Sequence, residues 1–394
     1  MFNFKTFNNI AEDGLDILRK NKFKEVSENP DGILLRSHNL LKEDFEDNLL
    51  CIARAGAGTN NIPKDDATKK GIVVFNTPGA NANAVKELVI CGMLLSSRGI
   101  VEGIEFAKNL DLEDSAGLNQ AMEAQKKTFA GNELAGKTLG IVGLGSIGSM
   151  LAQAAHTLGM KLVGYDPYIS IEGAWRLPRE VEKAETMEAL LQQSDYVSLH
   201  VPLVEDTKNL INGSNLNKFK KGARLINLSR GGIVNTNDVI AELENGNLGR
   251  FVTDFPTPEL IKRSAEKNDV ILPPHLGAST KEAEINCAVM AANQMVNYLQ
   301  DGTILNSVNF PRISLSRGTN HRLVIINHNE PGMIGKIADS IAACDINIAE
   351  MTNKSRDEIA INLIDLECQA SEELINQLRS VEHVMSVRSL DISS

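Results

Sequence analysis

The chain has 394 residues, of which 42% are hydrophobic and 23% are charged, and its formal net charge is −11. These proportions are typical of a globular protein of two to four domains, at about 100–200 residues per domain, with enough residues to bury a large core. The negative charge, without any long basic run, excludes nucleic acid as a partner, and no apolar run approaches the roughly 18 residues that a membrane span needs.

Residues 1–90 alternate short apolar runs with polar helical patterns, and we assign them to the first part of a substrate-binding domain. A long apolar helix is predicted at 88–108, followed by surface helix and loop up to residue 136. The predicted strands of this part are 32–35, 49–56 and 71–77.

From Lys137 onward strands alternate regularly with helices, which indicates right-handed crossovers and a parallel sheet. The strands are almost wholly apolar, as expected when helices cover both faces of a sheet. We assign residues 91–280 to this nucleotide-binding domain. Strands are predicted at 137–145, 161–167, 195–203, 223–231, 249–255 and 269–277, and helices at 146–159, 187–194, 216–222 and 237–246.

The pattern changes after a predicted helix at 281–302, which we assign back to the substrate-binding domain, so that the nucleotide-binding domain is an insertion. Residues 303–318 contain Pro, Gly and Ser with little periodicity and are predicted to form a linker. Residues 319–394 follow the order βαββαβ, which predicts a third, compact domain.

The five cysteines are scattered along the chain and form no CxxC pair. Such a set predicts a reducing compartment, with neither a disulfide framework nor a zinc site. The N-terminus has no apolar run after a basic start, so no signal peptide is expected. We therefore expect a cytoplasmic protein without a bound metal.

A glycine-rich turn follows the first strand of the inserted domain. Gly143, Gly145 and Gly148 form the pattern G-x-G-x-x-G between a predicted strand and a predicted helix, and Asp166 ends the next strand. The first glycine makes a tight turn, the second lets the backbone approach a pyrophosphate, and the third lets helix and strand pack closely. Asp166 would accept hydrogen bonds from ribose hydroxyls and repel a 2′-phosphate, which favours NAD over NADP. The alternative is a glycine turn in a domain that binds no nucleotide.

Three polar segments follow later strands of this domain, at the edge where open α/β sheets bind ligands. They contribute Arg230, Glu259 and His275. Oxidation of a hydroxy acid needs a base for the hydroxyl proton, a cation for the carboxylate, and a group that orients and charge-balances the base; His275, Arg230 and Glu259 supply one each. The alternative for His275 is a loop histidine without a role. Among the other histidines, His200 is a candidate to line the cofactor pocket.

The sequence resembles the D-isomer-specific 2-hydroxyacid dehydrogenases over essentially its whole length, and within them the short members that carry a C-terminal ACT domain. The matching motifs are GLGSIG with Asp166, NLSRGG, the segment from Asp254 to Glu259, PHLGAST, ARAGAGTNNI and FNTPGANANAVKEL. The resemblance implies a Rossmann-type doubly wound parallel sheet inserted in a flavodoxin-like α/β substrate domain, followed by a ferredoxin-like ACT domain. It also implies an NAD-dependent oxidation of a small D-2-hydroxy acid by hydride transfer.

The functional residues of the family fall on matching positions of this chain. The resemblance implies that Arg230, Glu259 and His275 are catalytic and that Asp254 holds the nicotinamide amide. The implied cofactor contacts are Thr77, Gly143, Gly145, Ser146, Ile147, Gly148, Asp166, His200, Val201, Pro202, Thr207, Leu228, Ser229, Arg230, Asp254, His275, Gly277 and Ala278. The implied substrate contacts are Arg36, Ser37, Arg54, Ala55, Gly56, Asn81, Arg230 and His275.

Arg36 and Arg54 bear on the identity of the substrate. Both end predicted strands, where they would present positive charge to a phosphate group. We therefore expect a phosphorylated 2-hydroxy acid. The alternatives are that each is a solvated surface arginine, and that the substrate is an unphosphorylated acid of the glycerate, lactate or 2-hydroxyglutarate type.

Two segments depart from the patterns of the family. The chain reads TDFPTPEL where the family has D-V-F-x-x-E-P. Counting from Asp254 puts Glu259 in the place of the acid, whereas aligning the Phe-Pro pair puts Pro258 there; we prefer the first count because it keeps a carboxylate beside the base. The W-x-R pattern common before the nucleotide domain is replaced by AQKKTFAG, where Lys126 or Lys127 is the candidate substitute.

The segment Asn327–Gly332 resembles the ligand loop of ACT domains, where a helix N-terminus offers free amide groups to a carboxylate. The resemblance implies serine as an effector at Asn327, Asn329 and Asn347, although regulated relatives often have histidine at the first position. The alternative is that this unit only assembles subunits through its sheet edges; a homodimer or homotetramer is expected. A non-catalytic NADH-sensing binding protein on the same scaffold is a further alternative, against which the ACT unit argues.

Overall fold

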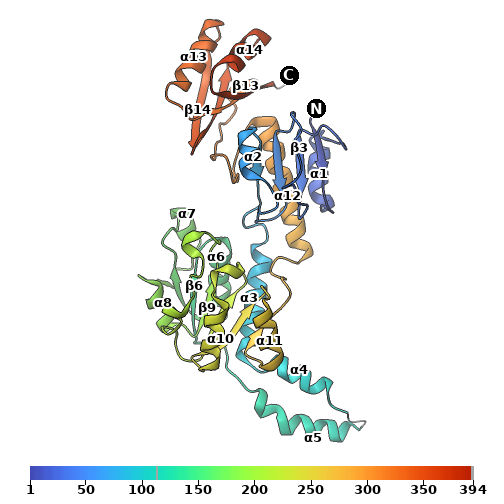
Figure 1. Ribbon diagram of the computed structural model, residues 1–394, viewed down its shortest axis with the longest axis vertical. Helices are drawn as coiled ribbons and strands as arrows, with labels where there is room; N and C mark the ends of the chain where they lie inside the picture. Colours follow the sequence, from blue (N-terminus) through green and yellow to red (C-terminus); the bar gives the residue numbers. More distant parts are fainter. Residues whose placement is uncertain (112–113, 392–394) are drawn as a thin grey trace. The chain divides into compact units, whose positions relative to one another are not determined.

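The computed structural model describes residues 1–111 and 114–391, and the chain divides into two compact units (Figure 1). The flanking unit consists of Met1–Asn81 and Lys281–Ser394, and the inserted unit of Ala82–Thr280. The inserted unit thus begins at Ala82 rather than at residue 91. The reason is that helix α3 (Ala82–Ser97) packs on helix α6 (Ser146–Thr157) and strand β10 (Ala223–Asn227) of that unit.

A seven-stranded sheet forms the centre of the inserted unit, in the order β12-β11-β10-β9-β6-β7-β8, with every neighbouring pair parallel. Successive side chains of a strand point to opposite faces, so Ile141 and Ile226 enter one apolar cluster while Val142 and Leu225 enter another. This confirms the doubly wound parallel sheet. The other strands are β6 (Thr138–Val142), β7 (Lys161–Tyr165), β8 (Val181–Lys183), β9 (Tyr196–Leu199), β11 (Leu248–Thr253) and β12 (Val270–Ile271).

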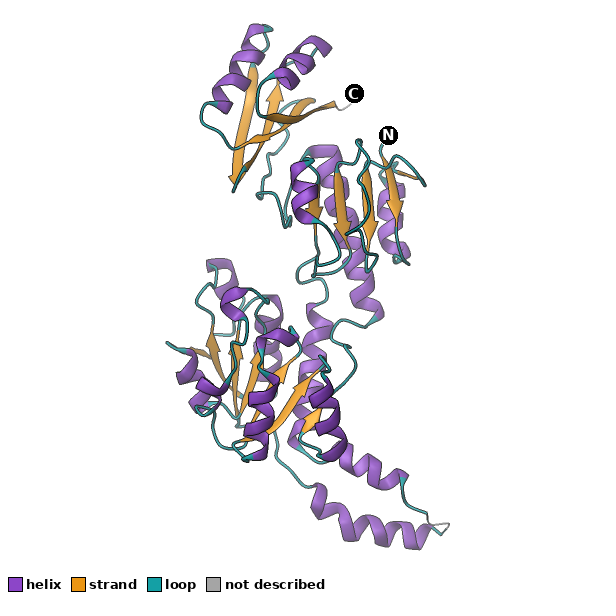
Figure 2. Cartoon of the chain, viewed as in Figure 1, coloured by secondary structure: helices purple, strands orange, loops and turns teal. Residues whose placement is uncertain are grey.

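Helices cover both faces of this sheet (Figure 2). Apolar side chains of α3 and α6 pack on one face, and those of α8, α10 and α11 pack on the other. Helices α4 (Ile100–Lys108) and α5 (Ser115–Gln125) contain no buried residue. The remaining helices are α7 (Ile171–Ala174), α8 (Met187–Gln193), α9 (Gly213–Leu216), α10 (Thr236–Glu244) and α11 (Pro258–Glu266), with 3-10 turns η1 (Lys126–Phe129), η2 (Glu205–Thr207) and η3 (Gly231–Ile233).

Three predicted elements differ from the structure. The long helix 88–108 is two helices, α3 and α4, which are interrupted at Gly99, because the amide of Gly99 donates to the carbonyl oxygen of Phe129 (3.1 Å) instead of to a carbonyl group one turn earlier in the helix. The helix expected at 216–222 is wrong, because α9 already ends at Leu216. The strand expected at 269–277 is only β12, since Pro273 and Pro274 have no N–H group for the ladder.

The first part of the flanking unit is a five-stranded parallel sheet in the order β2-β1-β3-β4-β5, which is the flavodoxin-like order. Helix α12 (Lys281–Asp301) returns to this sheet and packs on α1 (Glu12–Lys20), so closely that a Cβ on Gly14 would lie 2.8 Å from Ala288. The strands are β1 (Asn3–Thr6), β2 (Lys24–Glu25), β3 (Gly32–Leu35), β4 (Cys51–Arg54) and β5 (Val73–Phe75), and the third helix is α2 (Lys64–Lys69).

The C-terminal module of the flanking unit is a four-stranded antiparallel sheet in the order β14-β15-β13-β16 with two helices on one face (Figures 1 and 2). This confirms the βαββαβ order. The elements are β13 (His321–His328), α13 (Met333–Ala343), β14 (Ile348–Arg356), β15 (Ile359–Leu366), α14 (Glu372–Ser380) and β16 (Val384–Asp391).

Three arginines fasten this module to the C-terminal end of α12, whose last carbonyl groups lack partners within the helix. Arg388 donates to the carbonyl oxygen of Tyr298 (3.2 Å), Arg317 to that of Gln300 (3.0 Å) and Arg322 to that of Asp301 (3.2 Å). Arg322 and Asp365 also form an ion pair whose two side chains are fully buried. The module is therefore held by hydrogen bonds as well as by the apolar side chains of its open face.

Candidate active site

The glycine turn joins β6 to α6 and has the geometry that the fingerprint requires. Gly143 has φ +91°, a left-handed conformation, and a Cβ there would lie 2.7 Å from the carbonyl oxygen of His200. A Cβ on Gly148 would lie 2.1 Å from the carbonyl oxygen of Gly143, whereas no atom lies within 4 Å of the Cβ position of Gly145. The open space over Gly145, beside the free amide groups at the start of α6, suits a pyrophosphate.

Asp166 follows β7 and fixes this turn. One carboxylate oxygen accepts a hydrogen bond from the amide of Leu144 (2.8 Å), and the other accepts one from the amide of Tyr168 (2.9 Å). Each oxygen keeps a second lone pair with which it can accept a ribose hydroxyl group. Ser146 and Ile147 lie at the start of α6, so these two predicted cofactor residues adjoin the glycine turn that Asp166 fixes.

Strands β6 and β9 are neighbours at the centre of the sheet, where the direction of the strand order reverses, and open α/β sheets bind ligands at such a switch point. His200 follows β9, and burial lowers the pKa of its imidazole to about 4, so the ring is neutral at pH 7. Ser198 is hydrogen-bonded to its Nε2 atom (2.9 Å). The hydroxyl groups of Ser229 and Thr207 donate to the carbonyl oxygens of Val201 (2.9 Å) and Pro202 (2.5 Å), which fixes the loop after β9.

Asp254, directly after β11, is the buried carboxylate of the site, with 1% of its surface exposed. One oxygen accepts a hydrogen bond from the amide of Gly277 (3.0 Å), and the other has no partner in the described structure. Burial raises the pKa of Asp254, against the opposing effects of the Gly277 amide and of the nearby His275 and Arg230. An unpaired buried oxygen is costly, so this atom fits an amide donor of a bound cofactor.

Two of the three predicted catalytic residues lie around Asp254. The amide of His275 donates to the carbonyl oxygen of Asp254 (3.1 Å), and its ring meets the ring of Phe255 edge-on, with 5.1 Å between the ring centres. The exposed His275 has φ +46°, which is uncommon for a residue other than glycine. The carbonyl oxygen of Arg230 accepts a hydrogen bond from Asn227 (2.9 Å). No role was predicted for Asn227 or Phe255, although Asn227 lies in the motif NLSRGG and Phe255 in the segment from Asp254 to Glu259.

Glu259, the third predicted catalytic residue, is at the start of α11, and no hydrogen bond or ion pair joins it to His275 among the described residues. Its fully exposed carboxylate accepts hydrogen bonds from its own amide and from the Thr257 hydroxyl group, which lowers its pKa. Thr257 is the N-cap of the helix and Pro258 its first residue. A Thr-Pro-Glu sequence by itself favours the start of a helix. The presence of Glu259 at this position therefore has a structural explanation in addition to the predicted catalytic one.

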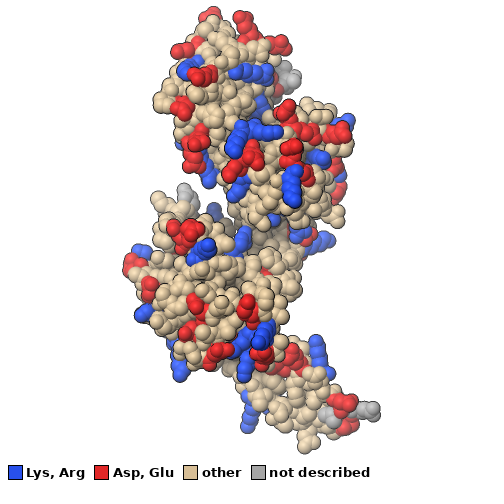
Figure 3. Space-filling view, viewed as in Figure 1, with Lys and Arg blue, Asp and Glu red and all other residues tan. Residues whose placement is uncertain are grey.

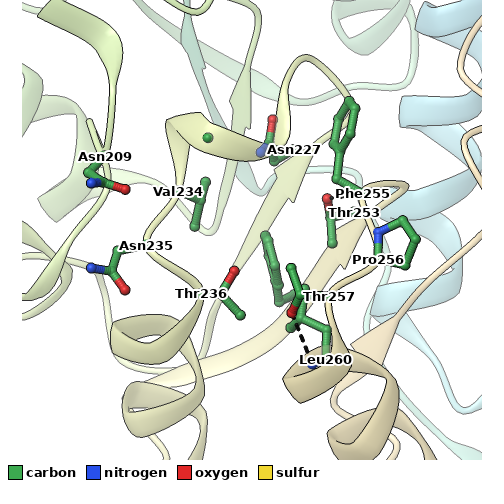
Figure 4. A pocket seen from close by; sticks show the side chains of 13 residues that line it. Asn209, Asn227, Val234, Asn235, Thr236, Thr253, Phe255, Pro256, Thr257 and Leu260 are labelled. Carbon is green, nitrogen blue, oxygen red and sulfur yellow. Dashed lines mark hydrogen bonds between the residues drawn. The ribbon is translucent and has the colours of Figure 1, made fainter. Parts of the chain in front are cut away.

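A cavity of about 460 Å³ lies beside this site, at the carboxyl ends of β10 and β11 (Figure 4). Asn235 and Thr257, the N-caps of α10 and α11, line it, and Figure 4 shows Thr257 accepting the hydrogen bond from the amide of Leu260. Asn227, Thr253 and Phe255 lie on its other wall. None of the residues predicted to bind cofactor lines this cavity.

The predicted substrate residues other than Arg230 and His275 belong to the flanking unit. Arg36 and Arg54 follow and end the adjacent strands β3 and β4, and the Nε atom of Arg54 donates to the carbonyl oxygen of Arg36 (3.0 Å). A Cβ on Gly56 would lie 2.7 Å from the Arg54 guanidinium, so glycine leaves room for that side chain. Thr77, predicted to contact cofactor, is in this unit too, and its amide donates to the carbonyl oxygen of Gly56 (3.1 Å). Lys126, a candidate substitute in η1, forms an ion pair with Glu123.

The three predicted effector asparagines all form hydrogen bonds within the C-terminal module. Asn327 is buried and accepts a hydrogen bond from Asn362 (2.8 Å). Asn329 donates to the carbonyl oxygen of Asp357 (3.1 Å), and Asn347 donates to the carboxylate of Glu367 (2.9 Å). Gly332, with φ +84°, begins α13 as the loop pattern requires.

Acidic and basic side chains are interspersed over the face visible in Figure 3. In the part of the chain that the structure describes, no helix has the length and apolar character to cross a membrane. Within the same residues, no group of His, Cys, Asp and Glu side chains is arranged to hold a metal ion.

Comparisons with known proteins agree with this geometry. D-3-phosphoglycerate dehydrogenase of Haemophilus influenzae is 33% identical over 94% of this chain and 88% of its own, and that of Escherichia coli K12 is 32% identical over 94% and 89%. A crystal structure of NAD+-bound 3-phosphoglycerate dehydrogenase from Entamoeba histolytica superposes with a TM-score of 0.60 at 26% identity, over 78% of this chain and 98% of that one. Residues 99–277 match the family model "D-isomer specific 2-hydroxyacid dehydrogenase, NAD binding domain". The chain therefore belongs to the D-isomer specific 2-hydroxyacid dehydrogenases and is an NAD-dependent oxidoreductase.

Proposed function

We propose that this protein oxidises D-3-phosphoglycerate to 3-phosphohydroxypyruvate with NAD, the first step of L-serine biosynthesis, in the cytoplasm. The observation that carries the proposal is the pair of arginines at the ends of β3 and β4, Arg36 and Arg54. Two guanidinium groups on one sheet edge suit a phosphate dianion, which an unphosphorylated acid does not require. The relatives named above support the same substrate.

The residues of the inserted unit supply the chemistry in this proposal. His275 accepts the proton of the C2 hydroxyl group, and bound NAD would supply the acceptor for the hydride of C2. Arg230 holds the carboxylate and the carbonyl oxygen that develops. Glu259 would stabilise the imidazolium form of His275 after its carboxylate leaves the start of α11, since hydrogen bonds between catalytic groups often form fully only with substrate bound.

In this proposal, different residues bind different parts of the dinucleotide. The amide groups at the start of α6, beside Gly145, would bind the pyrophosphate, and Asp166 would bind the ribose hydroxyls. The unpaired oxygen of Asp254 would accept a hydrogen bond from the nicotinamide amide and so fix which face of the ring is presented to the substrate.

We also propose a homodimer or homotetramer, with serine as an effector at the C-terminal module. Helices α4 and α5, which have no buried residue and leave Ile104 and Met122 exposed, support a contact with a second copy. The loop that starts α13 supports a carboxylate ligand, although Asn327, Asn329 and Asn347 would have to exchange their present partners for serine. Sedimentation with and without serine tests both proposals.

The test of the substrate is the decrease of NADH absorbance with 3-phosphohydroxypyruvate, compared with hydroxypyruvate, pyruvate and 2-oxoglutarate, each with and without serine. We expect kcat/KM for the phosphorylated acid to exceed that for hydroxypyruvate by about 100-fold, since one charge-assisted phosphate contact is worth roughly 1.5–3 kcal/mol. Equal turnover of an unphosphorylated acid would overturn the substrate but leave the family intact. No turnover of any acid would favour an NADH-sensing role.

A further inference from the structure

Arg36 already has an anionic partner within the chain. Its Nη1 atom lies 2.5 Å from the Oε1 atom of Glu284, in the first turn of α12, and both side chains are half-exposed, at 40% and 46%. The backbone carbonyl of Arg36 accepts hydrogen bonds from Arg54 and Asn61, so the main chain of Arg36 is fixed while its guanidinium faces α12. Neither the sequence motifs nor the roles proposed above use Glu284.

The surroundings of this pair hold α12 firmly against the two arginines. Ala283 and Cys287, on either side of Glu284 in the helix, are buried. Burial raises the pKa of the Cys287 thiol, and Arg36 and Arg54 both oppose that rise, which places both guanidinium groups near the same helical turn. The carboxylate of Glu284 therefore lies where an anion bound by Arg36 would also have to lie.

We infer that Glu284 is a specificity-determining residue that occupies Arg36 in the absence of substrate and must be displaced by the phosphate group. The inference rests on the proposed function for the identity of the ligand. A phosphate dianion brings more charge and more acceptor oxygens than a carboxylate, so it can replace Glu284 on a forked guanidinium. An uncharged hydroxyl group does not compete with Glu284 for Arg36, so the ion pair lowers the affinity for the phosphorylated acid and leaves the binding of an unphosphorylated acid unchanged.

The displacement predicts an effect on binding and not on the chemical step. In Glu284→Gln the neutral amide still accepts a hydrogen bond from Arg36 but neither competes as an anion nor repels the phosphate. We expect KM for 3-phosphohydroxypyruvate and the inhibition constant of inorganic phosphate to fall by about three- to tenfold. This is the gain in affinity expected when binding no longer has to break a half-exposed ion pair or overcome repulsion from a nearby carboxylate. KM for hydroxypyruvate and kcat for both acids should stay within about twofold.

The matched control is Glu282→Gln, which removes the same charge from the same turn of α12; no ion pair of Glu282 is recorded among the described residues. It should leave every constant within about twofold, and the melting temperatures of both variants should match that of the unsubstituted protein.

The outcomes separate this inference from the proposed function. If the unsubstituted protein does not prefer the phosphorylated acid, the proposed substrate is wrong, and the inhibition constant of inorganic phosphate alone then decides the role of Glu284. If the preference exists and Glu284→Gln leaves KM and the phosphate constant unchanged, the displacement is refuted. A higher KM in this variant would also refute it, since Glu284 would then orient Arg36 for the ligand.

Discussion

The buried pair of Arg322 and Asp365 gives the largest predictable effect on stability. Both side chains are fully buried, and Arg322 donates to both carboxylate oxygens (2.6 and 2.9 Å) as well as to the carbonyl oxygens of Asp301 (3.2 Å) and Leu315 (2.9 Å). Arg322→Met leaves a buried carboxylate without its partner, which costs about 3–5 kcal/mol. A module of about 70 residues is stable by roughly 4–10 kcal/mol, so the loss removes from about a third to all of its stability.

Hydrogen exchange followed by mass spectrometry is the assay, because it reports each part of the chain separately. We expect protection in peptides from β13 and β15 to fall by roughly 100-fold or more, at about 1.4 kcal/mol per tenfold. Peptides from β6 and β9 in the inserted unit should not change. The double variant Arg322→Met/Asp365→Leu should recover most of the loss, since an apolar pair replaces a buried ion pair at little cost. Protection within threefold of the original in the single variant would refute the reasoning, as would a double variant no better than the single one.

The same pair predicts a dependence on pH. Burial by itself raises the pKa of Asp365, but hydrogen bonds from Arg322 and from the amide of Gly318 outweigh it, so the pKa in the folded protein is lowered. A lowered pKa adds stability that is present above the unfolded value, near 3.9, and is lost as the pH falls toward the folded value. The module of the unsubstituted protein should therefore keep its protection from neutral pH to about pH 4 and lose it below.

Three further variants test the candidate active site. His275→Ala should lower kcat by at least about 100-fold while NADH affinity, measured from NADH fluorescence, stays within threefold; near-full activity would place the base elsewhere. Glu259→Gln should lower kcat by about 10-fold or more if its carboxylate reaches His275 during turnover, and an unchanged kcat with a slightly lower melting temperature would show that it serves only the start of α11. Asp166→Ala should weaken NADH binding by about tenfold or more, because the ribose loses its acceptor and the amides of Leu144 and Tyr168 lose theirs; unaltered affinity would exclude Asp166 from the cofactor site.

The elements predicted correctly are those whose signal is local. Apolar strands such as β6 and β10, and glycines such as Gly143 and Gly148 that a side chain would obstruct, are specified by residues a few positions apart. One error occurred where a distant segment decides the outcome. Helix 88–108 is interrupted because Phe129 passes close to Gly99, which periodicity in the helix itself cannot reveal.

The sequence by itself determined the parallel α/β architecture, the inserted nucleotide domain, the C-terminal βαββαβ module and the family, since periodicity and motif spacing are properties of the chain. Only the tertiary structure decided which of the predicted site residues already form ion pairs or hydrogen bonds within the chain. Glu284 follows Arg36 by 248 positions and lies 2.5 Å from it, whereas the carboxylate of Glu259 is hydrogen-bonded at the start of its own helix and has no hydrogen bond or ion pair with His275 among the described residues. The physical reason is that ion pairs and caps depend on distances between side chains, and folding sets those distances by bringing together strand ends and helix turns that the sequence keeps far apart.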